Sequence, residues 1–145
     1  MAEINGCDLP EDLYYLVEKH VWARPEPDGT IRVGLTDVAQ GLAKTFLSAR
    51  PKAVGRALKQ AQSAGTVESG KFVGPVPAPV SGEIIAVNEA LVTRPSLIND
   101  DPYGAGWFLI LRPADWEGER AGLAWGPEGL EKYREFLDSH GISCE

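Results

Sequence analysis

Cysteine and histidine are scarce in this chain of 145 residues, which contains two of each. Cys7 and Cys144 lie near opposite ends, no Cys-x-x-Cys spacing occurs, and His20 is far in sequence from His140. These residues do not form a zinc-ligand pattern, so we expect no metal site. Two thiols in a cytoplasmic protein usually stay reduced. The alternative is a redox-active pair, in which Cys7 and Cys144 form a disulfide between the two ends of the chain.

Long apolar runs and a basic face are also missing. The longest concentrated apolar stretch, residues 107–111, is far too short to cross a membrane. Residues 1–6 have neither a basic nor an apolar region of the kind found in secretory signal peptides. The net charge of -7 argues against a nucleic-acid-binding surface. We therefore expect a cytoplasmic protein that binds neither membranes nor nucleic acids.

The motifs of common catalytic sites are absent too. No phosphate-binding glycine loop and no Gly-x-Ser-x-Gly turn is present. The chain is long enough for one domain with a real core, and its 43% hydrophobic and 24% charged residues are ordinary for a globular protein. We predict a single domain over residues 1–145 that is not a stand-alone enzyme.

The most distinctive stretch is Glu68-Ser69-Gly70-Lys71-Phe72-Val73-Gly74, which precedes a segment rich in proline. Residues 65–67 and 80–87 flank it and are rich in β-branched residues, which is typical of strands. Gly70 and Gly74 permit the backbone angles of a tight turn. Lys71 has no neighbour that could neutralise a buried ammonium. The pattern predicts a β-hairpin with Lys71 exposed at its tip.

The N-terminal third predicts short strands. Residues 8–10 favour a helical turn, and residues 20–24 favour an edge strand. A Pro/Asp/Gly turn over residues 25–29 leads to a strand over residues 30–35. Thr36 or Asp37 can then cap a short helix through residue 40.

The C-terminal half predicts a strand, a loop and a helix. Residues 84–87 read as a strand that ends in a turn at residues 88–91, and a loop rich in proline and glycine leads to a closing strand over residues 107–111. Residues 127–141 predict a helix, because apolar residues recur at helical spacing and Gly141 can end it. Periodicity alone thus indicates a mainly β domain with a terminal helix.

A basic segment separates the N-terminal strands from the hairpin. Between Asp37 and Glu68 the chain has no acidic residue, and its basic residues are Lys44, Arg50, Lys52, Arg56 and Lys59. A run of like charge is often only a solvated face. The alternative is a docking surface for an acidic partner, centred on Lys44, Arg50 and Arg56, because complementary charge speeds and orients encounter.

Several motifs together resemble the glycine cleavage H-protein family. They are Glu68-Ser69-x-Lys71 with Gly82 eleven residues after the lysine, His20-x-Trp22, the segment Val33-Gly34-Leu35-Thr36-Asp37-Val38-Ala39-Gln40, and Pro95-x-Leu97-Ile98-Asn99 followed by Pro102-Tyr103 and Gly106-Trp107. The resemblance covers roughly residues 20–111. It implies a barrel-sandwich hybrid of two small antiparallel sheets, with short helices, an N-terminal extension over residues 1–19 and a C-terminal helix.

The resemblance also implies a cofactor and its attachment site. Lys71 would carry covalently bound lipoic acid, attached by a lipoate-protein ligase or lipoyl transferase that recognises Glu68 and Gly82. A carrier needs no acid–base pair, because the cofactor supplies the chemistry and the protein supplies tethering. We accordingly interpret His20 as structural and predict no catalytic residue. The methionines that flank a biotinyl lysine are missing.

The cargo is predicted from the departures from the family pattern. Glycine on both sides of the Lys71 turn and the three nearby prolines resemble H-like lipoate-binding proteins of sulfur oxidisers. The basic segment and the cysteines are further departures from the glycine-cleavage pattern. The preferred interpretation is therefore a carrier of sulfur intermediates that serves a heterodisulfide-reductase-like complex. The alternative is an H protein that carries the aminomethyl group among glycine decarboxylase, aminomethyltransferase and dihydrolipoamide dehydrogenase. A third possibility is a non-carrier interaction module with the same fold.

Overall fold

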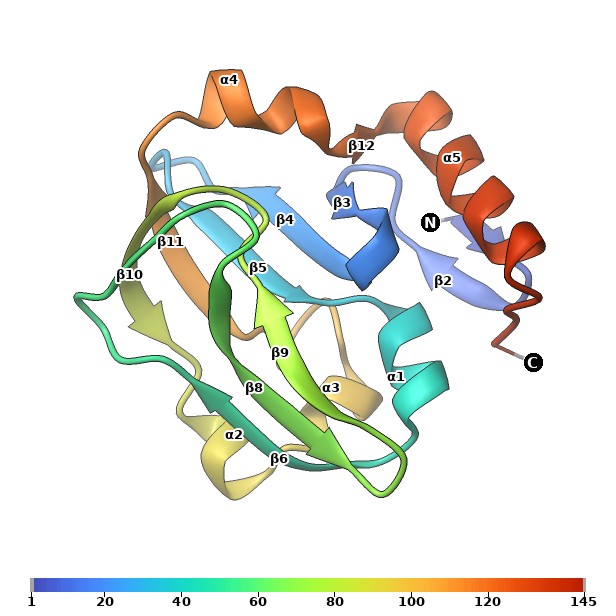
Figure 1. Cartoon of the computed structure of the whole chain (residues 1–145), viewed down its shortest axis with the longest axis horizontal. Helices are drawn as coiled ribbons and strands as arrows, with labels where there is room; N and C mark the ends of the chain where they lie inside the picture. The colour runs from blue at the N-terminus through green and yellow to red at the C-terminus, as the bar shows by residue number, and fades with distance from the viewer. Residues whose placement is uncertain (1, 145) are drawn as a thin grey trace.

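The computed structural model describes residues 2–144, in which two β-sheets pack around a shared core (Figure 1). The larger sheet has the strand order β12-β3-β4-β5-β11-β10-β7, the smaller has the order β6-β8-β9, and β1 and β2 form a separate hairpin. Every pair of neighbouring strands is antiparallel. The strands are β1 (Ala2–Ile4), β2 (Cys7–Leu9), β3 (Tyr14–Leu16), β4 (Val21–Pro25), β5 (Ile31–Leu35), β6 (Phe46–Pro51), β7 (Ala57–Leu58), β8 (Ser63–Ser69), β9 (Val73–Pro77), β10 (Gly82–Val87), β11 (Leu109–Pro113) and β12 (Ala124–Trp125).

The helices are short except for the last. They are η1 (Val17–Lys19), α1 (Asp37–Ala43), α2 (Ala90–Thr93), α3 (Leu97–Asp100), α4 (Trp116–Glu119), η2 (Arg120–Gly122) and α5 (Gly126–Ser139). None of the helices within residues 2–144 has the length and apolar character needed to span a membrane.

The core lies between the two sheets because apolar residues alternate along the strands. Val33, Ile84 and Leu111 of the larger sheet and Val67 and Val76 of the smaller sheet are all buried in one cluster. The residues between them on the smaller sheet, such as Thr66 and Glu68, face outward and are exposed. The mainly β sandwich with a C-terminal helix is thus confirmed, although the larger sheet has more strands than the expected small sheet.

The prediction of an edge strand over residues 20–24 is wrong. β4 lies inside the larger sheet, since it pairs with β3 on one side and with β5 on the other. Trp22 of β4 lies opposite Gly34 of β5, and a side chain at Gly34 would overlap the indole ring. The indole nitrogen also donates to the carbonyls of Leu35 and Pro102. The His20-x-Trp22 and Val33-Gly34-Leu35 motifs are therefore the two halves of one packing contact.

The N-terminal segment also differs from its prediction. Residues 7–9 form the strand β2 rather than a helical turn, with Cys7 and Leu9 buried and Asp8 exposed. Within the expected extension over residues 1–19, β1 and β2 form their own hairpin and β3 is a strand of the larger sheet. β2 pairs with the adjacent β1 and β3 with the nearby β4, and only the β3–β12 pairing joins distant parts of the chain.

Two local predictions are confirmed by backbone geometry. The Thr36 hydroxyl accepts from the backbone N–H of Ala39, which caps α1. At the end of α5, Gly141 adopts a φ of 64°, and the N–H groups of Gly141 and Ile142 donate to the carbonyls of Asp138 and Leu137. This is a Schellman arrangement, for which glycine is the usual residue. α5 begins and ends slightly earlier than the expected range 127–141.

Candidate functional site

The turn between β8 and β9 carries Lys71 at its tip, and the lysine is exposed. The Ser69 N–H donates to the Phe72 carbonyl at 2.7 Å, which closes the turn. The buried Ser69 hydroxyl accepts from the N–H of Lys71 at 3.2 Å and from the N–H of Phe72 at 3.1 Å. Serine therefore fixes the backbone beneath the lysine, as hydroxyl side chains do in such turns.

The glycines of the turn act differently from the prediction. Neither Gly70 nor Gly74 adopts a positive φ, so the turn does not depend on left-handed glycine. At Gly74, a β-carbon would lie 2.6 Å from the ring of Phe72. Gly74 therefore lets the Phe72 ring fold back over β9. At Gly70, an added β-carbon would meet nothing within 4 Å.

A cavity of about 250 Å³ opens beside Lys71. Its walls are mainly apolar side chains from α1 and from the strands around the turn, and three basic side chains also reach it. The lining residues are Lys19, His20, Leu35, Ala39, Leu42, Ala43, Phe46, Val67, Lys71, Phe72 and Pro75. Sequence reasoning did not find the cavity, because its walls come from segments that are far apart in the chain. The only local indication was a large apolar residue, Phe72, next to a turn lysine.

His20 forms part of this wall, and its ring contacts Tyr133 of α5. Its backbone has a φ of 59°, its Nδ1 lies 2.6 Å from the Tyr133 hydroxyl, and that hydroxyl lies 3.0 Å from the Thr36 hydroxyl. Burial of the imidazole, with a smaller contribution from the charge of His140, lowers the pKa of His20 to about 4. These contacts tie α5 to the base of α1, which fits the structural role expected for His20.

We expect the free energy of unfolding to decrease as the pH falls from about 6.5 to about 4. In this range the unfolded histidine takes up a proton and the folded one does not, so the contribution of His20 is complete above pH 6.5 and is lost as pH falls toward its folded pKa. The change should be at most about 3 kcal/mol. The free energy of unfolding measured with urea should depend less steeply on pH in His20→Asn, because asparagine does not titrate. Asparagine is chosen because it tolerates the positive φ at this position. Equal slopes would contradict this prediction.

The other predicted site residues occupy different places. Glu68 is exposed on the outer face of β8, paired with Val73 across the hairpin, and so lies beside the turn. Gly82 lies beyond the far end of β9, at the start of β10, and is buried. A side chain at Gly82 would overlap the Arg112 carbonyl oxygen. The structure thus gives Gly82 a packing role, and recognition of Gly82 by a ligase stays a prediction.

The cysteines, which sequence analysis left open, are joined in the structure by a Cys7–Cys144 disulfide. Lys44, Arg50 and Arg56 are all exposed along β6 and the adjoining segments. Residues 2–144 contain no cluster of three histidine, cysteine or acidic side chains that could hold a metal ion.

This sandwich, with an exposed lysine on a rigid hairpin tip, has the architecture of a lipoyl-type carrier domain. The glycine cleavage H-protein family profile matches residues 13–139, and the chain belongs to that family. It is 45% identical to glycine cleavage system H protein 5 of Aquifex aeolicus, covering 99% of both chains. It is 41% identical to H protein 2 of the same organism, covering 99% of this chain and 89% of the relative.

A solved structure agrees with the family assignment. The crystal structure of a glycine cleavage system H protein from Mycobacterium marinum superimposes with a TM-score of 0.74 at 33% identity, covering 92% of this chain and all of that one. The barrel-sandwich fold predicted from the resemblance is confirmed. Proteins of this family are carrier subunits with lipoate attached to a lysine, and they act with partner enzymes rather than as catalysts.

The relatives bear on the predicted cargo as well. Their names refer to glycine cleavage and not to sulfur oxidation. The preferred sulfur-oxidation interpretation is therefore not supported, and the glycine-cleavage alternative fits these findings better. Membership of a carrier family also disfavours the non-carrier interaction module.

Proposed function

We propose that the chain presents a lipoyl arm on Lys71 and carries the aminomethyl group of glycine between the enzymes of the glycine cleavage system. The observation that carries this proposal is the placement of Lys71. It is exposed at the tip of a turn that Ser69 fixes from beneath, beside an apolar cavity. Family membership supports both the cofactor and the cargo.

The residues around Lys71 fit the lipoyl group. When bound, this group supplies a dithiolane that accepts and releases the cargo, on a long chain that is apolar apart from its amide. Attachment removes the lysine charge, so nothing electrostatic keeps the arm out of the cavity. Leu42 and Phe72 would contact the apolar chain there. The neutral His20 adds no charge to the wall. The rigid turn restricts where the arm starts, which raises its effective concentration at a docked enzyme.

The proposal includes the partners implied by this role. They are a lipoate-protein ligase or lipoyl transferase, glycine decarboxylase, aminomethyltransferase and dihydrolipoamide dehydrogenase, all acting in the cytoplasm. Glu68 is the better placed of the two predicted ligase-recognition residues, because it is exposed beside the lysine whereas Gly82 is buried. A Glu68→Gln variant would therefore lower the rate of lipoylation more than the same replacement of a glutamate on α5, such as Glu135→Gln.

The proposed cargo is tested by loading the lipoylated chain. Glycine decarboxylase from the same organism is supplied with radiolabelled glycine, and label bound to the chain is measured. We expect label on the wild-type chain at a rate close to that of an established H protein. A lipoylated chain that takes up no label, while the established H protein does, would contradict the glycine-cleavage role without contradicting the carrier role.

A second candidate, the sulfur-oxidation carrier working with a heterodisulfide-reductase-like complex, retains one supporting observation. The similar Aquifex aeolicus proteins are numbered 2, 3 and 5, so that organism has several H proteins, and a single cleavage system requires only one type of carrier. Some copies are thus free to serve other reactions. The sulfur-oxidation role is tested by replacing Lys71 in the organism that encodes this chain and measuring growth on reduced sulfur compounds. Normal growth together with efficient glycine labelling would reject this candidate.

A further inference from the structure

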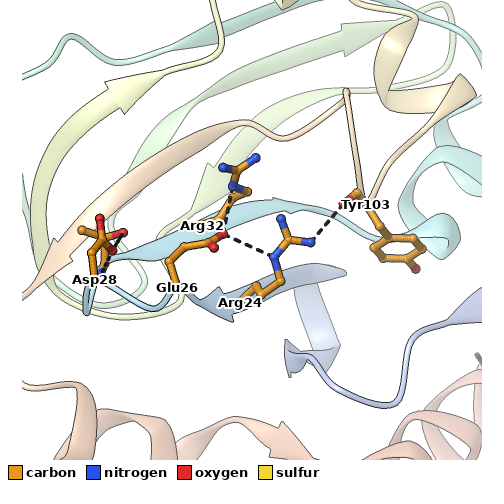
Figure 2. A network of polar contacts seen from close by, with 6 residues as sticks. Arg24, Glu26, Asp28, Arg32 and Tyr103 are labelled. Atoms are coloured by element: carbon orange, nitrogen blue, oxygen red, sulfur yellow. Dashed lines mark hydrogen bonds and ion pairs between the residues drawn. The ribbon is translucent and has the colours of Figure 1, made fainter.

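The arginines of this chain fall into two groups. Each arginine outside residues 38–67 has a carboxylate oxygen 2.7 to 3.5 Å away, namely Arg24, Arg32, Arg94, Arg112, Arg120 and Arg134. Figure 2 shows one case, in which Glu26 lies between the guanidinium groups of Arg24 and Arg32 on neighbouring strands. Arg50 and Arg56 have no such partner among the described residues. Lys44, Lys52 and Lys59 form no ion pair there either, but the same is true of Lys19, Lys71 and Lys132, so the contrast rests on the two arginines.

These five unpaired cations follow one edge of the molecule. β6 is an edge strand of the smaller sheet, and residues 52–56 continue from it toward β7. In Figure 1 this segment runs from the foot of α1 along the border of the sheet that carries the hairpin. We call Lys44, Arg50, Lys52, Arg56 and Lys59 the basic edge. All of its members are exposed except Lys52, which is half-buried.

The basic edge begins close to the lysine turn. Phe46 pairs with Ser69, the first residue of the turn, and Lys44 precedes Phe46 by two residues. Arg50 pairs with Thr66, three residues before Ser69, so it lies about 10 Å along the strand from the turn. An enzyme that approaches Lys71 over the outer face of this sheet would meet Lys44 and Arg50.

Exposed apolar side chains surround the lysine turn, with Leu47 on β6 and Phe72 and Val73 directly after Lys71. Leu47 is 64% exposed, Val73 is 69% exposed and Phe72 is 45% exposed. Large apolar residues at such exposure, next to unpaired cations, resemble a protein interface more than a solvated face. Five like charges without ion-pair partners among the described residues also repel one another. The chain has a net charge of -7, so a shortage of acidic residues does not explain why they are unpaired.

We infer that the basic edge docks against an acidic surface beside the active site of the enzymes that react with the arm. The inference rests on the proposed carrier function and extends it to the recognition of partners. Attraction between the two surfaces would steer the hairpin tip toward the partner's entrance, and the apolar side chains would then form the contact. An acidic protein surface is the occupant that this charge pattern fits. Nucleic acid and anionic membranes are the competing occupants.

The first test is zero-length carbodiimide cross-linking, which joins a lysine to a carboxylate in direct contact. The chain is mixed separately with glycine decarboxylase, aminomethyltransferase and dihydrolipoamide dehydrogenase, and cross-linked peptides are identified by mass spectrometry. We expect links from Lys44, Lys52 or Lys59 with at least one enzyme and none from Lys132 on α5. The Lys71→Arg variant should give the same links, because docking does not require the arm. The cross-links therefore report docking separately from attachment and loading of the arm.

The second test measures kinetics with matched charge reversals. Lys44→Glu, Arg50→Glu and Arg56→Glu are combined in one variant, and Arg112→Glu, Lys132→Glu and Arg134→Glu in a control with the same change of net charge. At low salt the first variant should raise the KM for the lipoylated chain at least about tenfold with little change in kcat, and the control should change KM little. The difference should vanish near 1 M salt, where the Debye length is about 3 Å.

Three results would overturn the inference. The first is the absence of cross-links from the basic edge with all three enzymes. The second is an equal KM for the two charge-reversed variants with an enzyme that reacts with the wild-type arm. The third is binding of phosphatidylglycerol vesicles or duplex DNA through the same lysines while the enzymes give no cross-links. An arm that reacts with none of the enzymes, despite cross-links, would instead contradict the proposed glycine-cleavage function.

Discussion

Replacing Lys71 by arginine is expected to abolish lipoylation completely. Attachment requires a lysine amine that can lose its proton and attack an activated acyl group, and a guanidinium does not deprotonate in proteins. Arginine keeps the charge and the approximate length, so the turn fixed by the Ser69 hydroxyl should remain intact. Intact-mass analysis after incubation with a lipoate-protein ligase should show one added lipoyl group on the wild type and none on the variant.

Lys19 provides a demanding control for this prediction. It lines the same cavity as Lys71, so nearness to the cavity alone does not distinguish the two amines. Lys19 ends the short helix η1, whereas Lys71 is on the hairpin tip beside Glu68. We therefore expect Lys19→Arg to gain lipoate at the wild-type rate. A Lys71→Arg chain that still gains the lipoyl mass, or a wild type that never gains it, would contradict the carrier proposal.

The position of this lysine could be predicted from the sequence, but the reason for its geometry could not. β-branched residues on both sides and the cluster of glycine and proline were enough to indicate a hairpin with Lys71 at the tip. The expected cause was glycine in a left-handed conformation. The structure shows instead that Ser69 holds the turn and that Gly74 makes room for Phe72. A serine next to glycine fits several turn types, so its side-chain bonds are visible only in three dimensions.

Very short strands and features formed by distant segments were beyond local sequence reasoning. β4 looked like an edge strand because β3, which covers its other side, has only three residues and so shows little alternation. The cavity beside Lys71 combines walls from η1, α1 and the four strands β5, β6, β8 and β9. The charge run at residues 44–59 was evident, whereas the lack of acidic partners for Arg50 and Arg56 within residues 2–144 became evident only when every other arginine proved to be paired. Pairing depends on tertiary position rather than on composition.

Removing the Cys7–Cys144 disulfide is expected to cause a large loss of stability. The bond joins residues separated by 137 positions, so it closes nearly the whole chain into a loop. In the chain-entropy description, such a loop restricts the unfolded state enough to contribute about 4–5 kcal/mol to the free energy of unfolding. This is an upper value, because a compact unfolded state has less freedom to lose. Cys7→Ser combined with Cys144→Ser should therefore unfold at a clearly lower urea concentration.

The folded contacts around the bond should survive its removal. The Cys144 N–H donates to the Asn5 carbonyl at 2.9 Å, and the Asn5 amide donates to the Asp138 carboxylate at 2.9 Å. These bonds hold the β1–β2 hairpin against the end of α5 without the sulfur atoms. We thus expect the double variant to keep the wild-type fold and its lipoylation, while its urea midpoint lies at or slightly below that of wild type treated with reductant.

The measurement that decides the disulfide's contribution is urea unfolding of the oxidised wild type, the reduced wild type and the double variant, followed by a non-reducing peptide map. The oxidised protein should be the most stable, followed by reduced wild type and then, at an equal or slightly lower midpoint, the double variant. Serine at the buried Cys7 position adds a polar group of its own, so reduced wild type is the cleaner comparison. Free thiols in freshly isolated protein, or midpoints that do not change on reduction, would show that the bond does not contribute to stability in solution.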